Sequence, residues 1–357
     1  MSTRIGILTS GGDCPGLNAV IRGVAKASYE LMKDVEIIGI IDGYRGLIQG
    51  EYKLMKKSDF SGILTLGGTI LGTSRQPFKQ MRVIGEDNVD KVKAMKDNYK
   101  KMGLDCLLIL GGNGTHKTAA LLAEEGLNVI GLPKTIDNDL YGSDVTFGFH
   151  SALDIATEAL DRLHTTAASH GRVMVVELMG NKTGWLTLNA GIAGGADVIL
   201  LPEIPFDMDK VAAAVQKRAD SGKAFSIIAV AEGAMEKSEP TKRKERLAAR
   251  SAAGFHNISE KIAPAIIQKT ACETRVVIPG HLQRGGAPSA YDRLLSTQFG
   301  AYAAHLIQEK KFGVTVAKVG NTNTQNKLSD IAGKAKLVSP DDQMVQVAKS
   351  MGISFGD

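Results

Sequence analysis

The sequence predicts an α/β protein with two doubly wound lobes, mainly parallel sheets and a ligand-binding cleft between the lobes. Apolar strand patterns alternate with helix patterns from the first residues, which is typical of parallel βαβ units. The alternation restarts after Phe149, and a chain of 357 residues is long for a single core. Many of the 40 glycines stand where a predicted strand ends, at the edge where such folds bind ligands.

The first lobe begins with an apolar strand that leads directly into a glycine-rich turn. Its predicted elements, in order, are strand Arg4–Thr9, helix Leu17–Lys33, strands Glu36–Ile41 and Ile63–Leu66, helix Val89–Met102, strand Cys106–Leu110, helix His116–Glu125 and strand Asn128–Leu132. Gly103 and Gly126 each separate a helix from the next strand, as left-handed helix caps do.

The second lobe repeats the alternation. Its predicted elements are helix Leu153–Ser169, strand Arg172–Leu178, helix Leu186–Ala193, strand Val198–Leu201, helix Met208–Ser221 and strand Phe225–Ala231. The segment Glu236–Arg250 is the most polar part of the chain and mixes both signs of charge. A solvated loop or exposed helix is favoured there over a docking surface.

Composition excludes several classes of protein. Hydrophobic residues at 43% and charged residues at 23% are typical of a globular protein. The net charge is +5, and the chain has no basic stripe with interleaved aromatics, so no nucleic-acid partner is expected. No apolar run approaches the roughly 20 residues of a membrane span, and nothing resembles a signal peptide. Three cysteines fit no metal or disulfide framework, which favours a reducing cytoplasm.

Glycine-rich turns follow three of the predicted strands, at Ser10–Gly16, Gly67–Arg75 and Gly111–Thr115. An anion can approach the backbone closely where no Cβ intervenes, and the turn directs N–H groups and the positive end of a helix toward one point. Three converging loops predict a polyphosphate ligand rather than a single phosphate.

An acidic segment, Pro133–Asp139, follows another predicted strand. Asp137 and Asp139, together with a hydroxyl and an amide, can serve as a general base and a metal ligand. An Asx-rich turn with capping aspartates is the alternative, and the segment alone leaves both open. The neighbouring glycine loops favour catalysis, in which Asp137 deprotonates an attacking hydroxyl and positioning supplies most of the acceleration.

Charged residues are also expected near strand ends of the second lobe. They are Arg172, Glu232, Arg275, His281 and Arg284. Arginine captures phosphate in a bidentate manner, although each of these arginines alone is more often a surface ion pair. His281 and Arg284 are three residues apart between glycines and can reach one ligand. Glu232 can accept hydrogen bonds from sugar hydroxyls or cap a helix.

These motifs resemble the phosphofructokinase family, in the family's order and over at least residues 4–300. The matching motifs are Gly11–Asn18, Gly67–Thr69, Gly111–Thr115, Pro133–Asp139, Met179–Gly180 and Gly280–Gly286. The resemblance implies a glycolytic kinase with two Rossmann-like lobes and its active site in the cleft. It would transfer the γ-phosphoryl of ATP to the 1-hydroxyl of fructose 6-phosphate with Mg²⁺. The implied donor lobe is 1–148 plus about 283–333, and the implied sugar-phosphate lobe is 149–282 plus about 334–357.

The resemblance also implies a role for each matching residue. Asp137 would be the base, supported by Thr135 and Lys134. The donor would bind Gly12, Arg75, Gly112, Asn113, Gly114 and Thr115, and Mg²⁺ would bind Asn113 and Asp139. The sugar phosphate would bind Thr135, Asp137, Asp139, Met179, Gly180, Glu232, His281 and Arg284. Arg172 and Arg275 would reach a neighbouring subunit's site in a homotetramer, or at least a homodimer.

Two positions bear on the phosphoryl donor. Pyrophosphate-dependent members of the family carry aspartate where this chain has Gly114, so glycine leaves space for the α-phosphate of ATP. Lys134 is shared with the pyrophosphate-dependent branch, and the combination resembles the mixed-substrate bacterial branch, which is usually ATP-dependent. Asn113 and Asn181 replace a usual aspartate and a usual arginine.

Of three alternatives, the first two stay open. One is the same transfer from pyrophosphate. Another is a weakly catalytic regulatory paralogue, suggested by Asn113 and Asn181. A glycine-loop kinase acting on a lipid or on NAD would share only one of the loops.

Overall fold

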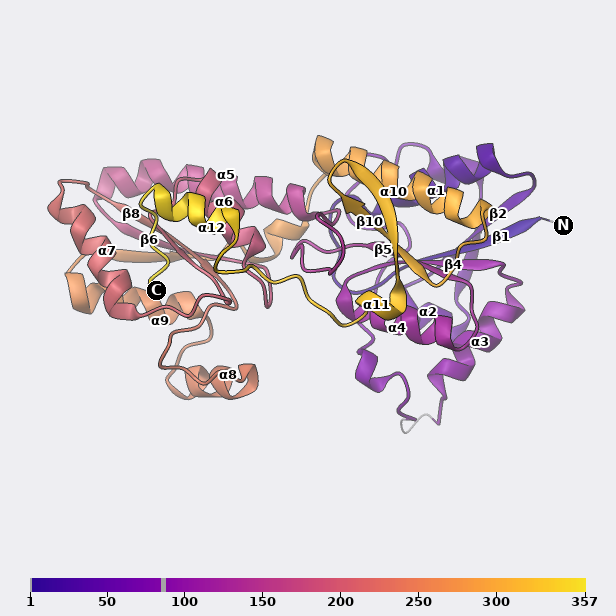
Figure 1. Ribbon diagram of the computed structural model, residues 1–357, viewed down its shortest axis with the longest axis horizontal. Coiled ribbons are helices and arrows are strands. Elements are labelled where there is room, and N and C mark those ends of the chain that lie inside the picture. The colour runs from indigo at the N-terminus through magenta and orange to yellow at the C-terminus, as the bar shows by residue number, and fades with distance from the viewer. Residues whose placement is uncertain (1, 85–87) are drawn as a thin grey trace. The chain divides into compact units, whose positions relative to one another are not determined.

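The computed structural model describes residues 2–84 and 88–357, and the chain divides into two units (Figure 1). Unit 1 comprises Met1–Ser151 and Arg284–Lys336, and unit 2 comprises Ala152–Gln283 and Leu337–Asp357. Each unit therefore combines two stretches that are far apart in the sequence.

Unit 1 contains a seven-stranded sheet in the order β11-β10-β5-β4-β1-β2-β3. Its elements are β1 (Thr3–Thr9), α1 (Leu17–Leu31), β2 (Val35–Ile40), α2 (Tyr44–Gln49), β3 (Tyr52–Met55), η1 (Lys57–Phe60), η2 (Phe78–Gln80), α3 (Lys91–Lys101), β4 (Cys106–Gly111), α4 (Asn113–Glu124), β5 (Val129–Pro133), α10 (Ala290–Gln308), β10 (Val314–Val319), β11 (Thr322–Lys327) and α11 (Leu328–Ile331). Five strands pair in parallel, while β3 and β11 are antiparallel at the two edges. The prediction of a mainly parallel α/β fold is confirmed.

The strand order changes direction between β1 and β4. The chain passes from β1 to β2 on one side and later returns to β4 on the other side, where Ile5 pairs with Cys106 and Thr9 with Leu110. The carboxyl ends of these two strands therefore lie next to each other. In doubly wound folds this switch point is where ligands bind.

Helices cover both faces of this sheet. α2, α3, α4 and α11 share one apolar core, and α1 and α10 cover the other face (Figure 1). The backbones of α1 and α10 approach closely, since a Cβ on Gly300 would lie 2.6 Å from the carbonyl oxygen of Val20. Glycine is thus required at this helix contact.

The predicted strand Ile63–Leu66 is wrong. These residues form an irregular segment in which Ile63 is buried and Leu66 is half exposed. The place beside β2 is taken instead by Tyr52–Met55, which forms antiparallel strand β3. Because β2 pairs with β1 on one side and with β3 on the other, Ile63–Leu66 has no free strand edge to pair with there.

Unit 2 contains a four-stranded parallel sheet in the order β7-β8-β6-β9. Its elements are α5 (Phe149–His170), β6 (Val173–Leu178), α6 (Trp185–Ala193), β7 (Val198–Leu200), α7 (Met208–Asp220), β8 (Ser226–Ala231), α8 (Arg243–Ala252), α9 (Ile258–Thr270), β9 (Thr274–Val277), η3 (Gly280–Arg284) and α12 (Gln343–Ser350). α7 and α9 pack on one face, with α5, α6 and α12 on the other (Figure 1).

Candidate active-site loops

The first glycine loop follows β1 at the switch point and is contacted by two cationic side chains. The ammonium of Lys134 donates a hydrogen bond to the carbonyl oxygen of Gly12. Arg284 Nη1 donates to the carbonyl oxygen of Asp13 at 3.0 Å, and a Cβ on Gly12 would lie 2.9 Å from the same nitrogen. The loop therefore combines accessible backbone with positive charge, as a phosphate site requires.

Lys134 is buried beneath this loop. Burial lowers the pKa of its ammonium, while the neighbouring Cys14 and Asp137 favour the charged form and Arg284 opposes it. A bound polyanion would stabilise the charged lysine. The thiol of Cys14 is buried as well, and burial raises its pKa to about 12, so it is not a nucleophile at neutral pH.

The loop Gly111–Thr115, which we call the second glycine loop, runs into the first turn of α4. The helix begins at Asn113 after the N-cap Gly112, so Gly114 and Thr115 lie inside it. The predicted helix began only at His116 and would have left both residues before the helix. First-turn N–H groups lack intrahelical partners and carry the positive end of the helix dipole. A Cβ on Gly114 would meet no atom within 4 Å, so the space in front of this turn is open.

The third segment, Gly67–Arg75, reaches the same place without a preceding strand. Thr73 Oγ1 donates to the carbonyl oxygen of Gly11 at 2.7 Å, and the carbonyl oxygen of Ser74 accepts from the Gly11 N–H at 3.0 Å. Arg75 follows directly and is exposed. The first and third segments thus lie together, although the strand that was predicted to bring the third one there does not exist.

The acidic segment after β5 is a hydrogen-bonded turn. Thr135 Oγ1 accepts from the Asp137 N–H at 3.0 Å, and Asn138 Oδ1 accepts from the Thr146 N–H at 3.1 Å. Asn138 is buried in the left-handed region at φ 51°, which asparagine tolerates better than most residues. Asp137 and Asp139 on either side of it are partly exposed. The segment is therefore the Asx-rich turn considered as an alternative to a catalytic segment, and this turn leaves both carboxylates partly accessible to solvent.

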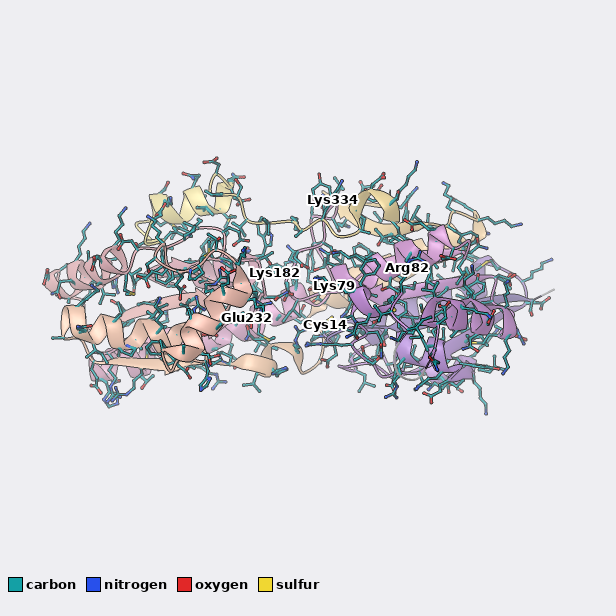
Figure 2. The ribbon with its side chains drawn as sticks, turned by 90° about the horizontal axis from the view of Figure 1, so that it is seen from below. Cys14, Lys79, Arg82, Lys182, Glu232 and Lys334 are labelled. Atoms are coloured by element: carbon teal, nitrogen blue, oxygen red, sulfur yellow. The ribbon has the colours of Figure 1, made fainter. Side chains whose placement is uncertain are left out.

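A cavity of about 610 Å³ lies along α4, where Lys117, Ala120, Leu121 and Glu124 line it. Its lining includes the aromatic ring of Phe78, the cations Arg82, Lys117 and Lys334, and Gly333. Arg82 and Lys334 are labelled in Figure 2. An aromatic surface with several cations suits a nucleoside phosphate. The sequence analysis missed these residues because they come from three separate parts of the chain.

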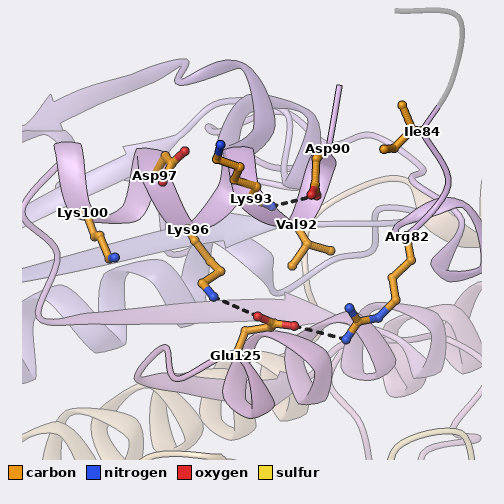
Figure 3. Close-up of a pocket in the computed structure, with 9 residues that line it drawn as sticks. All are labelled: Arg82, Ile84, Asp90, Val92, Lys93, Lys96, Asp97, Lys100 and Glu125. Atoms are coloured by element: carbon orange, nitrogen blue, oxygen red, sulfur yellow. Dashed lines mark hydrogen bonds and ion pairs between the residues drawn. The ribbon is translucent and has the colours of Figure 1, made fainter. Parts of the chain in front are cut away.

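Arg82 also lines a neighbouring hollow of about 600 Å³ on α3 (Figure 3). Glu125 accepts from Lys96 at 2.8 Å and from Arg82 at 3.2 Å. The hydrogen bond from Lys96 and the charges of both cations lower the pKa of the Glu125 carboxyl. The ion pair therefore fixes one side of the Arg82 guanidinium next to the cavity.

In unit 2, the predicted sugar-phosphate residues follow three neighbouring strands. The Met179–Gly180 turn follows β6, Glu232 follows β8, and Gly280 lies just beyond β9. Glu232 Oε1 accepts from the N–H groups of Gly180 at 3.2 Å and Asn181 at 2.7 Å, so the carboxylate anchors this turn. Glu232 and Lys182 are labelled in Figure 2.

Gln283 joins two of these segments and was missed by the sequence analysis. Its side chain is fully buried, its Oε1 accepts from the Met179 N–H at 3.3 Å, and its Nε2 donates to the carbonyl oxygen of Gly280 at 3.0 Å. In the sequence, Gln283 lies between His281 and Arg284, the two residues that were predicted to bind one ligand. His281 belongs to unit 2 and Arg284 to unit 1.

Arg172 and Arg275 do not lie where strands end, contrary to the sequence-based expectation. Arg172 immediately precedes β6, and Arg275 is the second residue of β9. Both form ion pairs with Glu273, at 3.1 Å for Arg172. Because the strands are parallel, both arginines are near the amino ends of the strands, whereas Met179 follows a carboxyl end. At about 3.3 Å per residue, Arg172 is about 23 Å from Met179 along the strand direction, and Arg275, which pairs with Met174, is about 17 Å away.

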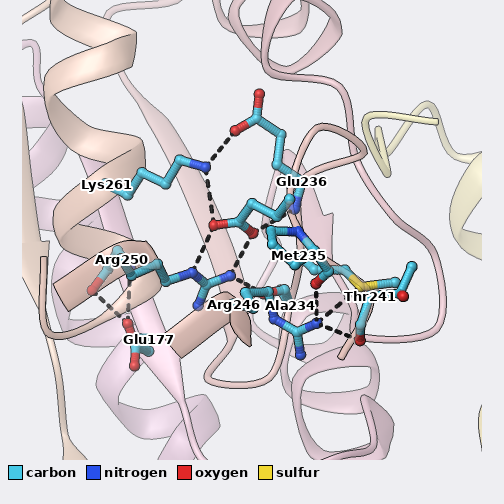
Figure 4. Close-up of polar contacts among 11 residues, drawn as sticks. Glu177, Ala234, Met235, Glu236, Thr241, Arg246, Arg250 and Lys261 are labelled. Atoms are coloured by element: carbon cyan, nitrogen blue, oxygen red, sulfur yellow. Dashed lines mark hydrogen bonds and ion pairs between the residues drawn. The ribbon is translucent and has the colours of Figure 1, made fainter. Parts of the chain in front are cut away.

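The polar segment is not simply solvated. It contains α8, whose Arg246 and Arg250 are buried (Figure 4). Arg250 forms an ion pair with Glu239 at 2.7 Å, and Lys261 reaches the same carboxylate at 3.0 Å. Burial alone would raise the pKa of Glu239, but hydrogen bonds from Arg250, the Glu236 N–H and Lys261 lower it to about 2. This ion network fastens α8 to the rest of unit 2.

The predicted metal ligands differ in how well they suit Mg²⁺. Asn113 uses both ends of its amide, since Oδ1 accepts from the Gly333 N–H at 3.0 Å and Nδ2 donates to the Lys334 carbonyl oxygen at 2.9 Å. Asp139 is a partly exposed carboxylate. In the described part of the chain, no three His, Cys, Asp or Glu side chains gather around a possible metal position. These residues fit Mg²⁺ that is held mainly by substrate phosphates and one carboxylate.

No helix within residues 2–84 and 88–357 has the length and apolar character needed to cross a membrane.

The doubly wound sheets, with glycine loops at the switch point of unit 1, define an α/β protein of the phosphate-binding class. A family model described as phosphofructokinase matches residues 4–307, and the chain belongs to the phosphofructokinase family. The prediction made from the six motifs is thus confirmed.

Similar proteins cover the chain almost completely. A protein of Spirochaeta thermophila named ATP-dependent 6-phosphofructokinase is 55% identical over 99% of this chain and 97% of its own length. ATP-dependent 6-phosphofructokinase 3 of Bacteroides thetaiotaomicron is 47% identical over 99% of this chain and 100% of its own length. The solved phosphofructokinase of Saccharomyces cerevisiae superposes with a TM-score of 0.80 at 30% identity, over 98% of this chain. The present chain spans 46% of the yeast chain.

Proposed function

We propose that the protein is an ATP-dependent 6-phosphofructokinase, which transfers the γ-phosphoryl group of ATP to the 1-hydroxyl of fructose 6-phosphate. The observation that carries this proposal is the open first turn of α4 at Gly114, in a chain 55% identical to a protein named for that activity. The products are fructose 1,6-bisphosphate and ADP, as expected for an enzyme of glycolysis.

The donor binds to unit 1 in this proposal. Its phosphates contact the glycine loops and neighbouring residues, which are Gly12, Arg75, Gly112, Gly114 and Thr115. Its nucleoside occupies the cavity lined by Phe78, Arg82 and Lys117. Lys134 supports the first loop through the Gly12 carbonyl and supplies buried positive charge beneath it.

Asp137 is the catalytic base. It accepts the proton of the 1-hydroxyl while that oxygen forms a bond to the γ-phosphorus, and the bond from phosphorus to the β,γ-bridging oxygen breaks as ADP leaves with the electron pair. Thr135 fixes the Asp137 backbone through its hydroxyl. Mg²⁺, when bound with the donor, neutralises phosphate charge, and Asp139 would hold it.

The sugar phosphate binds to the loops that follow the strands of unit 2, through Met179, Gly180, Glu232 and His281, and to Arg284. Glu232 accepts two backbone N–H groups and thereby fixes the turn that contacts the sugar. Arg172 and Arg275, near the opposite edge of the same sheet, serve the site of a neighbouring subunit. This assignment requires an oligomer, which we propose to be a homotetramer with shared sites.

We place the enzyme in the cytoplasm, where its two substrates are available. The free thiols of Cys14, Cys106 and Cys272 suit a reducing compartment.

A coupled assay with fructose 6-phosphate tests the proposal. It is run with ATP and with pyrophosphate as donor, with and without Mg²⁺. We expect ATP to have the higher kcat/KM. Preference for pyrophosphate would favour the related transferase activity, and turnover with neither donor would favour a regulatory paralogue, for which Asn113 and Asn181 at positions of charged residues are the specific reason.

A further inference from the structure

A short segment, Gly333–Lys336, lies along two loops that the proposed function assigns to phosphoryl transfer. We call this segment the strap. It belongs to unit 1, and it contributes Gly333 and Lys334 to the wall of the cavity assigned to the nucleoside. Its two ends are fastened to different loops.

One end is fastened to the second glycine loop by a single side chain. Asn113 Oδ1 accepts from the Gly333 N–H at 3.0 Å, while Asn113 Nδ2 donates to the Lys334 carbonyl oxygen at 2.9 Å. Gly333 has φ 88°, and a Cβ there would lie 2.7 Å from Cε of Lys117 on α4. The strap therefore lies directly against the helix that begins with the glycine loop.

The other end is fastened to the acidic segment and the residues after it. The Lys336 N–H donates to the carbonyl oxygen of Asp139 at 2.8 Å, and Ala335 pairs with Leu140 in an isolated antiparallel bridge. The Lys336 ammonium donates to the carbonyl oxygen of Asp144 at 2.7 Å. The strap thus connects the loop that contains Gly114 with the loop that contains Asp137 and Asp139.

We propose that Asn113 is a positioning residue for the donor site, and not a metal ligand. It holds the strap, which forms one wall of the nucleoside cavity and fixes the second glycine loop relative to the acidic segment. The assignment rests on the proposed function, because that function identifies the cavity as the donor site.

The chemistry of the side chain supports this assignment. The amide of asparagine accepts from one backbone N–H and donates to the next carbonyl at the same time, whereas an ionised carboxylate can only accept. An aspartate at this position would keep the acceptor but lose the donor, and it would place a negative charge against the Lys334 carbonyl oxygen, now 2.9 Å from the amide nitrogen. The strap would detach at that carbonyl.

The test uses Asn113→Asp, with Asn128→Asp as a matched control. Asn128 makes the same kind of bond, from Nδ2 to the Asp105 carbonyl oxygen at 2.9 Å, away from the loops. For Asn113→Asp we expect KM for ATP to rise roughly three- to tenfold, as for one or two lost hydrogen bonds, with KM for fructose 6-phosphate unchanged. The control should keep both constants.

A metal ligand would behave in the opposite way. Replacing a neutral ligand by a carboxylate should lower the Mg²⁺ concentration needed for half-maximal rate and improve the use of ATP. That result, or an unchanged KM for ATP, would overturn the positioning role. Gly333→Ala perturbs the strap from the other side and should reproduce the rise in KM for ATP if Asn113→Asp fails to fold.

Amide hydrogen exchange of the strap supplies a readout that needs no substrate. In Asn113→Ala, the Gly333 N–H loses its acceptor and should exchange at least about fivefold faster than in wild type. Unchanged exchange would mean that Asn113 does not hold the strap. If wild type shows no kinase activity while Asn113→Ala speeds this exchange, the proposed function fails and the structural role of Asn113 stands.

Discussion

Introducing a carboxylate at Gly114 tests which donor the enzyme accepts. Gly114 is exposed in the first turn of α4, and a Cβ there meets no atom within 4 Å, so Gly114→Asp should fold without steric conflict. An aspartate in the first turn of a helix is also favoured by the helix dipole, by about 0.3–1 kcal/mol. The melting temperature of the variant should therefore equal or exceed that of wild type.

The substitution should weaken the use of ATP rather than the stability of the fold. In the proposed function, the α-phosphate would occupy the space next to Gly114, where a Cβ meets no atom within 4 Å, and the new carboxylate would enter the same space. Two unit charges at about 4 Å repel by about 1 kcal/mol in water and about 4 kcal/mol at an effective dielectric constant of 20. The loop is partly hydrated, so about 2 kcal/mol is expected, which is a roughly 30-fold loss in kcat/KM for ATP.

The assay compares kcat/KM for ATP and pyrophosphate in wild type, Gly114→Asp and Gly114→Asn. The asparagine variant adds the same volume without charge and separates steric from electrostatic loss. Pyrophosphate should be affected less, because it has no α-phosphate beyond the two transferring positions. If Gly114→Asp uses ATP within threefold of wild type, or if wild type already prefers pyrophosphate, the reasoning about this position is refuted.

Four further predictions concern other parts of the site and its support. Asp137→Ser should lower kcat by at least about 100-fold with little change in KM, because general-base catalysis acts on the chemical step, as steady-state kinetics would show. Co-assembly of Asp137→Ser chains with Arg275→Ala chains should restore activity above that of either variant alone, measured after mixed refolding. Gln283→Leu should raise KM for fructose 6-phosphate roughly three- to tenfold without changing KM for ATP, since two buried hydrogen bonds to the sugar-phosphate loops are lost. Arg250→Met should cost about 3–5 kcal/mol in chemical denaturation, because it leaves the Glu239 carboxylate buried with one cation fewer.

Each of these has an outcome that contradicts it. Near-normal kcat in Asp137→Ser removes that residue as the base, and inactive mixed oligomers refute the shared site. Equal changes in both KM values would make Gln283 a general structural residue. For Arg250, the pH dependence is a second check: the folded-state pKa of Glu239, about 2, lies below its usual 4.5, so its stabilisation is present above pH 4.5 and disappears as the pH falls toward 2. An Arg250→Met variant with the full acid dependence of wild type would refute the ion-pair account.

The parts of the site that follow local rules were predictable. β1 and β4 each contain a run of buried, mostly apolar residues that leads into glycines, and a helix follows each, so both strands and the loops after them could be predicted from the local sequence. The phosphate-binding role of these loops stays a prediction. The same rule failed at Ile63–Leu66, where four residues of strand character have no neighbouring strand. Strand formation there depends on the sheet order, which a local pattern does not contain.

Residues that act through distant contacts were not predictable. Asn113 and its partners Gly333 and Lys334 are 220 and 221 positions apart, and Gln283 bonds to Met179 across 104 positions. Nothing near these residues in the sequence indicates such partners. Arg172 and Arg275 were expected near strand ends, but they lie near the start of β6 and β9, where the strand direction sets their side of the sheet.

The discontinuous construction of unit 1 has a consequence for how the chain is made. β5 pairs with β10, and α1 packs against α10, yet β10 and α10 are synthesised after the whole of the β6–β9 sheet. Until then a nascent chain would expose the outer edge of β5 and the glycine-containing face of α1. Such an edge is a template for pairing with other chains. An isolated fragment that ends at Ser151 should therefore aggregate, and during synthesis the sheet that begins first is completed only after the whole β6–β9 sheet has been made.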